Sequence, residues 1–175
     1  MESMIEFVHQ RISQNQYSIG IDFTMGNGHD TLFLAKYCQT VHSFDIQEQA
    51  LVSSRQLVKD QGHVFLHLDS HEHFLNYVDH FDVGIFNLGY LPQGDHHITT
   101  QSDVTLNTLR QALIALNPLG HIYLVVYIGH EEGLKESALI DAYVASLDHK
   151  LYNVALFKMM NKDHAPYVLD IEKRK

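Results

Sequence analysis

Residues 22–31, which read Asp-Phe-Thr-Met-Gly-Asn-Gly-His-Asp-Thr, combine two closely spaced glycines with acidic and hydroxyl side chains. A short apolar segment, residues 19–21, precedes them, and a helical pattern begins at His29. A strand, a glycine turn and a helix N-terminus together bring backbone close to a ligand, with N–H groups pointing outward. The run therefore predicts a ligand-binding turn built on Gly26 and Gly28.

A further acidic residue, Asp45, ends the next apolar segment, residues 41–44. A carboxylate in this position accepts hydrogen bonds from a ribose diol, which suits either a dinucleotide or S-adenosylmethionine. The spacing alone does not choose between these two cofactor classes. Thr31 stands where the dinucleotide fingerprint has its third glycine, and this disfavours NAD. Capping of the following helix is the alternative role for Asp45.

Asp69 closes a third apolar segment, residues 64–68, and is followed by Ser70. The position suits a contact between the Asp69 carboxylate and the exocyclic amine of adenine. Capping of the next helix by Asp69 or Ser70 is the competing interpretation, because both residue types are good N-caps.

A fourth apolar segment, residues 82–86, is followed by a predicted loop that contains Asn87, Gly89, Tyr90 and Pro92. Open α/β folds bind ligands at this edge of the sheet, and the loop resembles the Asn-Pro-Pro-Tyr loop of methyltransferases that modify amino nitrogens. The Asn87 oxygen and a loop carbonyl can accept hydrogen bonds from an NH₂ group and aim its lone pair at a methyl donor, while the Tyr90 ring can stack on a base. The alternative is a simple turn made by Asn87 and Gly89.

Two histidines follow later apolar segments and could assist an amine that must lose a proton. They are His130, after the fifth segment, and His164, in a predicted hairpin. Solvated loop histidines are the commoner case. The chain has 14 histidines, but they show no fixed ligand spacing with cysteine or carboxylate, so we expect no metal site.

The composition predicts one domain over residues 1–175, with 45% hydrophobic and 19% charged residues. A single cysteine, Cys38, excludes an intramolecular disulfide and fits a reducing compartment. No signal peptide or membrane span is recognisable, so we expect a cytoplasmic protein. The net charge of −9 argues against extended binding of a phosphate backbone but does not exclude local contacts between a compact enzyme and a few phosphates.

Short apolar runs alternate with segments of helical period, which is typical of a parallel sheet flanked by helices. The first helix, around Ile5 to Ile12, is expected at the sheet edge. Because only a short connection separates the last two strands, they should form an antiparallel hairpin. Class I methyltransferases end in this way, with an antiparallel seventh strand. The seven expected strands are residues 19–23, 41–45, 64–68, 82–86, 120–127, 151–158 and 166–172.

Taken together, these motifs resemble the small YtqB/MnmM-type family of class I methyltransferases, the "putative rRNA methylase" group. The likeness covers essentially the whole chain and is carried by residues 26–31, 44–47, 87–92, 94–95, 127, 129–130, 133 and 164–167. The predicted fold is therefore α/β and Rossmann-like, a mostly parallel seven-stranded sheet with an antiparallel last strand and helices on both faces. Phe23 and Ile128 depart from the family pattern. Phe23 could narrow the cofactor pocket, and Ile128 puts a substrate contact in doubt.

The resemblance implies S-adenosylmethionine as cofactor, with Asp22 facing its ammonium group. We assign catalysis to Asn87, Tyr90 and His130. The predicted cofactor-binding residues are Asp22, Thr24, Gly26, Asn27, Gly28, Asp30, Thr31, Asp45, Gln47, Asp69, Ser70, His71 and Asn87. The predicted substrate-binding residues are Leu88, Gly89, Tyr90, Pro92, His130, His164 and Tyr167.

The implied reaction is methyl transfer to the 5-aminomethyl group of a tRNA wobble uridine at position 34, giving 5-methylaminomethyl-(2-thio)uridine. The expected partner is thus the tRNA anticodon region, with a homodimer supplying extra binding surface. Methylation of rRNA or of a small-molecule amine is the first alternative. A non-catalytic module that binds S-adenosylmethionine is an alternative from another class, and an NAD-dependent enzyme is a distant third.

Overall fold

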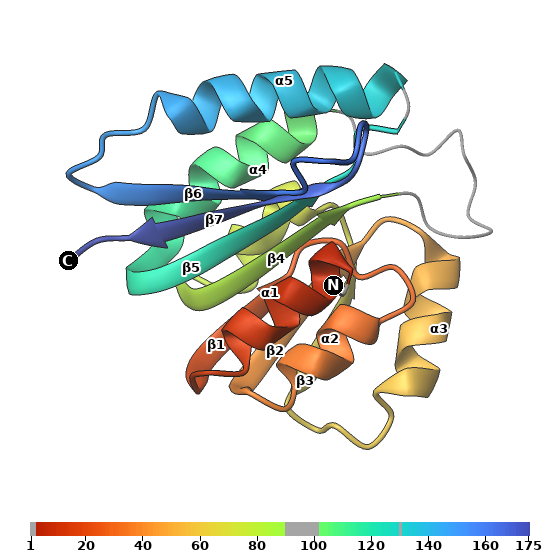
Figure 1. Ribbon diagram of the computed structural model, residues 1–175. Coiled ribbons are helices and arrows are strands. Elements are labelled where there is room, and N and C mark those ends of the chain that lie inside the picture. The colour runs from red at the N-terminus through yellow and green to blue at the C-terminus, as the bar shows by residue number, and fades with distance from the viewer. Residues whose placement is uncertain (1–2, 90–101, 130) are drawn as a thin grey trace.

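The computed structural model describes residues 3–89, 102–129 and 131–175. Its seven strands form one sheet in the order β3-β2-β1-β4-β5-β7-β6 (Figure 1). All neighbours are parallel except β7, which is antiparallel to both β5 and β6, so the predicted mixed sheet is confirmed. The strands are β1 (Tyr17–Asp22), β2 (Cys38–Asp45), β3 (Val64–Leu68), β4 (Phe81–Leu88), β5 (Leu116–Val126), β6 (Tyr152–Lys158) and β7 (Tyr167–Lys173).

Helices cover both faces of the sheet, as predicted (Figure 1). One face carries α1 (Met4–Ile12), α2 (His29–Leu34) and α3 (Glu48–Leu57). The other carries the 3₁₀ helix η1 (His71–Asn76), α4 (Ser102–Ala115) and α5 (Glu131–Ala145). Each face has its own apolar core, since alternate residues of a strand point to opposite sides.

Helix α1 contacts β5 and β7, so the expectation that it packs at the sheet edge is wrong. The edge strands are β3 and β6. The reason lies in its buried side chains: Val8 and Ile12 join a cluster with Tyr123 and Val168 in the interior of the sheet. A capping box at the helix start fixes its first turn.

Strand β5 begins at Leu116 and not at residue 120 as predicted. Its early part is irregular, because Leu119 has a φ of 65° and the pairing register with β4 shifts between Phe81 and Val83. Regular pairing starts at His121, which explains why the apolar pattern located only the later part of the strand.

Candidate active site

The predicted glycine turn connects the carboxyl end of β1 to α2. Gly26 and Gly28 have φ values of 50° and 82°, a left-handed backbone that favours glycine. A Cβ atom at Gly28 would lie 2.6 Å from Ser54 Oγ and 3.0 Å from Ser54 Cα. Gly28 is therefore needed for the close approach of α3, and the space beside it is filled by this chain.

Asp45, at the carboxyl end of β2, holds the same turn from the other side. Its Oδ2 accepts the Gly26 N–H at 3.0 Å, and its Oδ1 accepts the Gln47 N–H at 2.9 Å. The N-cap of α3 is Gln47, so the alternative in which Asp45 caps this helix does not hold. A carboxylate has about four acceptor positions, which leaves Asp45 able to accept a ribose diol as well.

Asp22 ends β1 in the centre of the sheet and is fully buried. Its oxygens accept hydrogen bonds from the Thr24 N–H at 3.1 Å and from Thr31 Oγ1 at 2.6 Å. Burial, and secondly the charge of Asp30, raises the pKa of Asp22 to about 7. The structure thus places Asp22 under the turn, which differs from the predicted contact with an ammonium group.

Thr31 and Phe23 also lie differently from what the sequence predicted. Thr31 is fully buried and bonded to Asp22 and to Ser43 Oγ, at 2.8 Å, so its hydroxyl supports the turn from inside. Phe23 stacks on Phe86 with ring centroids 4.2 Å apart and lies in the core. It does not narrow a pocket at the turn. Asn27 is half-buried in the turn.

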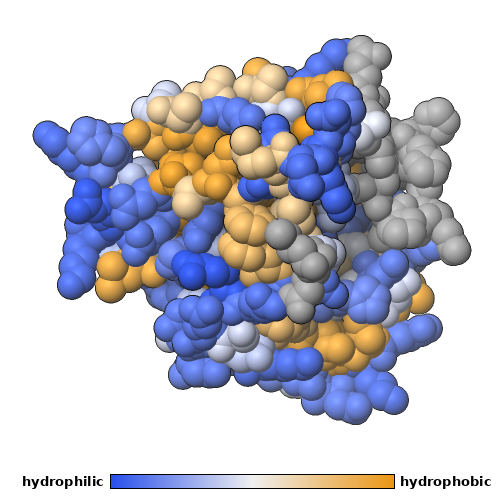
Figure 2. Space-filling view, viewed as in Figure 1, coloured by the Kyte–Doolittle hydropathy of each residue, from blue (hydrophilic) through white to orange (hydrophobic). Residues whose placement is uncertain are grey.

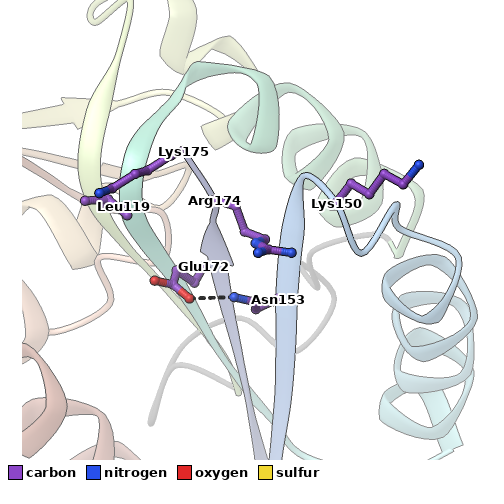
Figure 3. A pocket seen from close by; sticks show the side chains of 6 residues that line it. All are labelled: Leu119, Lys150, Asn153, Glu172, Arg174 and Lys175. Atoms are coloured by element: carbon purple, nitrogen blue, oxygen red, sulfur yellow. Dashed lines mark hydrogen bonds between the residues drawn. The ribbon is translucent and has the colours of Figure 1, made fainter.

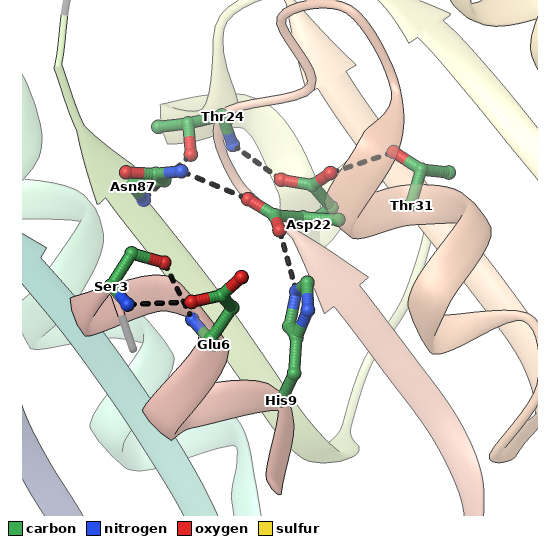
Figure 4. Close-up of polar contacts among 8 residues, drawn as sticks. Ser3, Glu6, His9, Asp22, Thr24, Thr31 and Asn87 are labelled. Carbon is green, nitrogen blue, oxygen red and sulfur yellow. Dashed lines mark hydrogen bonds and ion pairs between the residues drawn. The ribbon is translucent and has the colours of Figure 1, made fainter. Parts of the chain in front are cut away.

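Asn87, near the end of β4, is anchored through two groups (Figure 4). Its backbone N–H donates to Thr24 Oγ1 at 2.8 Å, and its side-chain Nδ2 donates to Asp30 Oδ2 at 3.0 Å. Because a carboxylate only accepts hydrogen bonds, Asp30 selects the amide orientation with Nδ2 toward itself. Oδ1 of Asn87 consequently points away from Asp30, and no described residue donates a hydrogen bond to it.

His9 joins this group from α1, and sequence reasoning missed it. His9 Nε2 lies 2.7 Å from Asp30 Oδ1, and its ring stacks on Phe33 with centroids 3.8 Å apart. Figure 4 shows His9 reaching toward the turn from below. No spacing signal could have indicated this residue, because the contact depends on where α1 packs on the sheet.

The end of β3 is more exposed. Asp69 accepts hydrogen bonds from the Ser70 N–H at 2.8 Å, from His73 Nδ1 at 2.8 Å and from the Tyr77 hydroxyl at 2.9 Å. These bonds, that from His73 most of all, lower the pKa of Asp69. Ser70 is the N-cap of η1, as the capping alternative proposed. His71 is buried, and its Nδ1 donates to the Phe23 carbonyl at 2.8 Å.

The predicted substrate residues that the structure describes separate into an exposed group and a buried group. Gly89 is exposed beside Asn87, and a Cβ on it would lie 3.4 Å from the ring of Tyr127. His164 is exposed in the turn between β6 and β7, at the same edge of the sheet. Leu88, in contrast, packs in the core, and the buried Tyr167 donates its hydroxyl to Asp141 at 2.7 Å. Tyr90, Pro92 and His130 lie outside the described residues.

A hollow of about 460 Å³ lies at the opposite edge of the sheet (Figure 3). Lys150, Arg174 and Lys175 give its lining a positive character, and Asn153 donates to Glu172 across it at 2.9 Å. None of the predicted site residues lines this hollow. Within the described part of the chain, no three histidine, cysteine or acidic side chains group as a metal site would require. Among the helices that the structure describes, none combines the length and apolar character needed to span a membrane.

Comparison with known proteins identifies the family and supports the fold. The family model described as "Putative rRNA methylase" matches residues 41–172. The chain belongs to this family. Its fold is that of the class I, S-adenosylmethionine-dependent methyltransferases, so the predicted family, fold class and enzyme class are confirmed.

Two crystal structures extend the match over the glycine turn. A putative rRNA-methylase from Clostridium thermocellum is 31% identical, with a TM-score of 0.93 over 99% of this chain and 98% of that one. A putative methyltransferase from Streptococcus mutans, solved in complex with SAH (S-adenosylhomocysteine), is 36% identical, with a TM-score of 0.91 over 99% of both chains.

A curated relative has a more specific name. The Arabidopsis thaliana protein "tRNA (mnm(5)s(2)U34)-methyltransferase, chloroplastic" is 35% identical in an alignment of 171 positions, which covers 88% of this chain. The alignment covers 62% of the relative, so this chain spans less than two thirds of its length.

Proposed function

We propose that the protein methylates the amino nitrogen of 5-aminomethyl-(2-thio)uridine at wobble position 34 of tRNA. The observation that carries this proposal is the Asn87 side chain, whose amide is fixed with Oδ1 turned away from Asp30. An oriented carbonyl oxygen suits an acceptor that carries N–H groups. The name of the Arabidopsis thaliana relative supports the same acceptor.

The residues at the carboxyl edge of β1, β2 and β3 fit S-adenosylmethionine, which supplies a methyl group on a positively charged sulfur. Asp45 would accept hydrogen bonds from the ribose diol, and Asp69 would accept one from the adenine amine. Between Asp45 and Asp22, the left-handed Gly26 and Gly28 bring the main chain close to this edge of the sheet. The SAH bound to the Streptococcus mutans relative supports this cofactor. The remaining cofactor contacts that we propose are made by Thr24, Asn27, Gln47, Ser70 and His71.

On the acceptor side, Asn87 Oδ1 and the exposed backbone at Gly89 would hold the amine. Tyr90 would stack on the base, and His130 would take part in removing the proton. His164 lies at the same edge of the sheet and would contact the nucleotide. Alignment of the amine with the methyl carbon then accounts for most of the rate, because positioning alone can contribute several kcal/mol.

The net charge of −9 leaves limited attraction for RNA phosphates, and we propose that a homodimer supplies further binding surface. Edge strand β6 supports this proposal, because Val154 and Leu156 are exposed on it and Met160 beyond it is 93% exposed. Figure 2 shows hydrophobic residues gathered over this region. Sedimentation equilibrium tests the proposal, and a monomer at all concentrations would refute it.

The test of the proposed reaction is nucleoside mass spectrometry on tRNA from cells that lack the protein. Aminomethyl-uridine should accumulate, with loss of the methylaminomethyl form. An unchanged profile would reject the wobble-uridine assignment and favour rRNA or a small amine. If no acceptor gains a methyl group while S-adenosylmethionine still binds, the protein is a non-catalytic binding module.

A further inference from the structure

We propose that His9 is a positioning residue for methyl transfer, acting through Asp30 to fix the amide of Asn87. The effect on catalysis rests on the proposed function. The structural part of the inference does not, since it concerns only contacts within this chain. It makes helix α1 a part of the active site, although the helix lies outside the segment that the family model matches.

The first step of the argument concerns the two oxygens of Asp30. Oδ1 faces His9 Nε2 at 2.7 Å, and Oδ2 accepts from Asn87 Nδ2 at 3.0 Å. The Asp30 side chain is 10% exposed, so few waters can replace either partner. Since the carboxylate can only accept, Nε2 of His9 must carry the proton of this hydrogen bond. The two donors together leave Asp30 one orientation.

The second step concerns how His9 itself is held. Its ring stacks nearly parallel on Phe33, with centroids 3.8 Å apart and planes 6° apart. Phe33 and Asp30 are three residues apart on α2, so one helix contacts both the face and the Nε2 atom of the imidazole. Met4, Val8 and Ile12 of α1 are buried against the sheet. His9 therefore projects from a helix that is fixed on the sheet.

The third step is the consequence for Asn87. If His9 stopped donating, Asp30 could turn, and the Asn87 amide would lose the partner that sets its orientation. An amide that rotates presents NH₂ in place of Oδ1 to the acceptor and no longer accepts a hydrogen bond from it. Small errors in the position of a reacting group reduce the rate strongly. The cofactor contacts at Asp45 and Asp69 do not involve His9 and should be unchanged.

The test compares three variants of the full chain. His9→Phe keeps a ring on Phe33 and removes the N–H donor, while His9→Gln restores an N–H near the position of Nε2. His63→Phe is the matched control, because the Nε2 atom of His63 bonds the Ala35 carbonyl at 2.9 Å at the other end of the sheet. Melting temperatures of all three variants would show whether each one folds.

The first readout is the side-chain amide signal of Asn87 in a ¹⁵N–¹H spectrum, identified by its loss in Asn87→Asp. We expect His9→Phe to shift this signal, His9→Gln to return it most of the way, and His63→Phe to leave it unchanged. The amide of Asn117, which donates to Asp82 Oδ1 at 2.7 Å, should stay constant in all variants. An unmoved Asn87 signal in His9→Phe would overturn the proposal, whatever the acceptor is.

The second readout is steady-state kinetics on tRNA from cells that lack the protein. His9→Phe should lower kcat roughly 10- to 100-fold, with the Kd for S-adenosylmethionine changed less than about twofold, and His9→Gln should recover most of kcat. A variant His9→Gln as slow as His9→Phe would contradict positioning by an N–H donor. If the wild type itself transfers no methyl group, the proposed function fails, and the amide spectrum still decides the structural part.

Discussion

The two ends of the predicted cofactor site differ in how their carboxylates are held. At the β1 and β4 end, Asp22 is fully buried and Asp30 nearly so, and each bonds to partners fixed in the fold. At the β3 end, Asp69 bonds to two surface side chains, with His73 51% and Tyr77 43% exposed. The comparison indicates that the end proposed to carry out methyl transfer is held rigidly by the fold, while the end proposed to bind adenine can adapt.

The largest effect should come from Asn87→Ala. Removal of the oxygen that we propose orients the acceptor should reduce kcat by at least about 100-fold, because the amine would then lack its positioning group. The Kd for S-adenosylmethionine, measured by calorimetry, should stay within about threefold. Normal turnover by this variant would refute the role given to the rigid end of the site.

Asp45→Ala should have the opposite effect and weaken the binding of S-adenosylmethionine. It removes the predicted ribose acceptor and two hydrogen bonds that hold the turn and the start of α3. Charged hydrogen bonds contribute about 1.5–3 kcal/mol each, so we expect the Kd for S-adenosylmethionine to rise roughly 10- to 100-fold. Unchanged affinity in calorimetry would argue against the ribose assignment.

Thr31→Val tests the buried support of the turn through stability and its pH dependence. The loss of the hydroxyl donor to Asp22 should lower the free energy of unfolding by about 1–3 kcal/mol. The loss should be larger at pH 8 than at pH 5, since Asp22, with a pKa of about 7, is mostly ionised only at the higher pH. Urea unfolding at both pH values measures this. Equal losses would show that the ionised form does not depend on Thr31.

Asp22 should also make the stability of the wild-type protein depend on pH. Its pKa is raised from 3.8 to about 7, so the folded state holds its proton more tightly than the unfolded chain. Between about pH 3.8 and pH 7 Asp22 ionises in the unfolded chain but keeps its proton in the folded state, so the free energy of unfolding falls as the pH rises through this range. Asp22→Asn should remove this part of the pH slope in urea unfolding, and a wild-type slope in that variant would contradict the assignment.

The smallest effect is expected at the adaptable end. Asp69→Asn keeps an acceptor oxygen and changes only exposed hydrogen bonds, so the Kd for S-adenosylmethionine should rise about two- to fivefold, with kcat unchanged. A loss as large as that of Asp45→Ala would show that the β3 end is as rigid and as important as the β2 end. Calorimetry under the same buffer conditions compares the two directly.

The sequence predicted the strand ends well, because apolar segments followed by acidic or amide residues mark the carboxyl edge of a parallel sheet. It located Asp45, Asp69 and Asn87 at that edge, and the short connection after β6 predicted the antiparallel β7. These features depend on the local order of apolar and polar residues, which can be seen directly in the sequence.

Orientation and long-range contacts could not be predicted in the same way. Phe23 follows β1 directly, and only the packing of its ring against Phe86 shows that it points into the core. Asp22 ends β1 and Asp30 lies in the first turn of α2, yet Asp22 is buried beneath the glycine turn and Asp30 accepts a hydrogen bond from Asn87. His9 enters the site because α1 crosses the interior strands, a tertiary arrangement that no local spacing encodes.

The most direct test of the central claim is to add the purified protein and S-adenosylmethionine to tRNA from cells that lack it. Nucleoside mass spectrometry then follows the wobble uridine. The account predicts that aminomethyl-uridine gains one methyl group with the wild-type protein and stays unmodified with Asn87→Ala. No gain of mass with the wild type, or equal gain with both proteins, would contradict it.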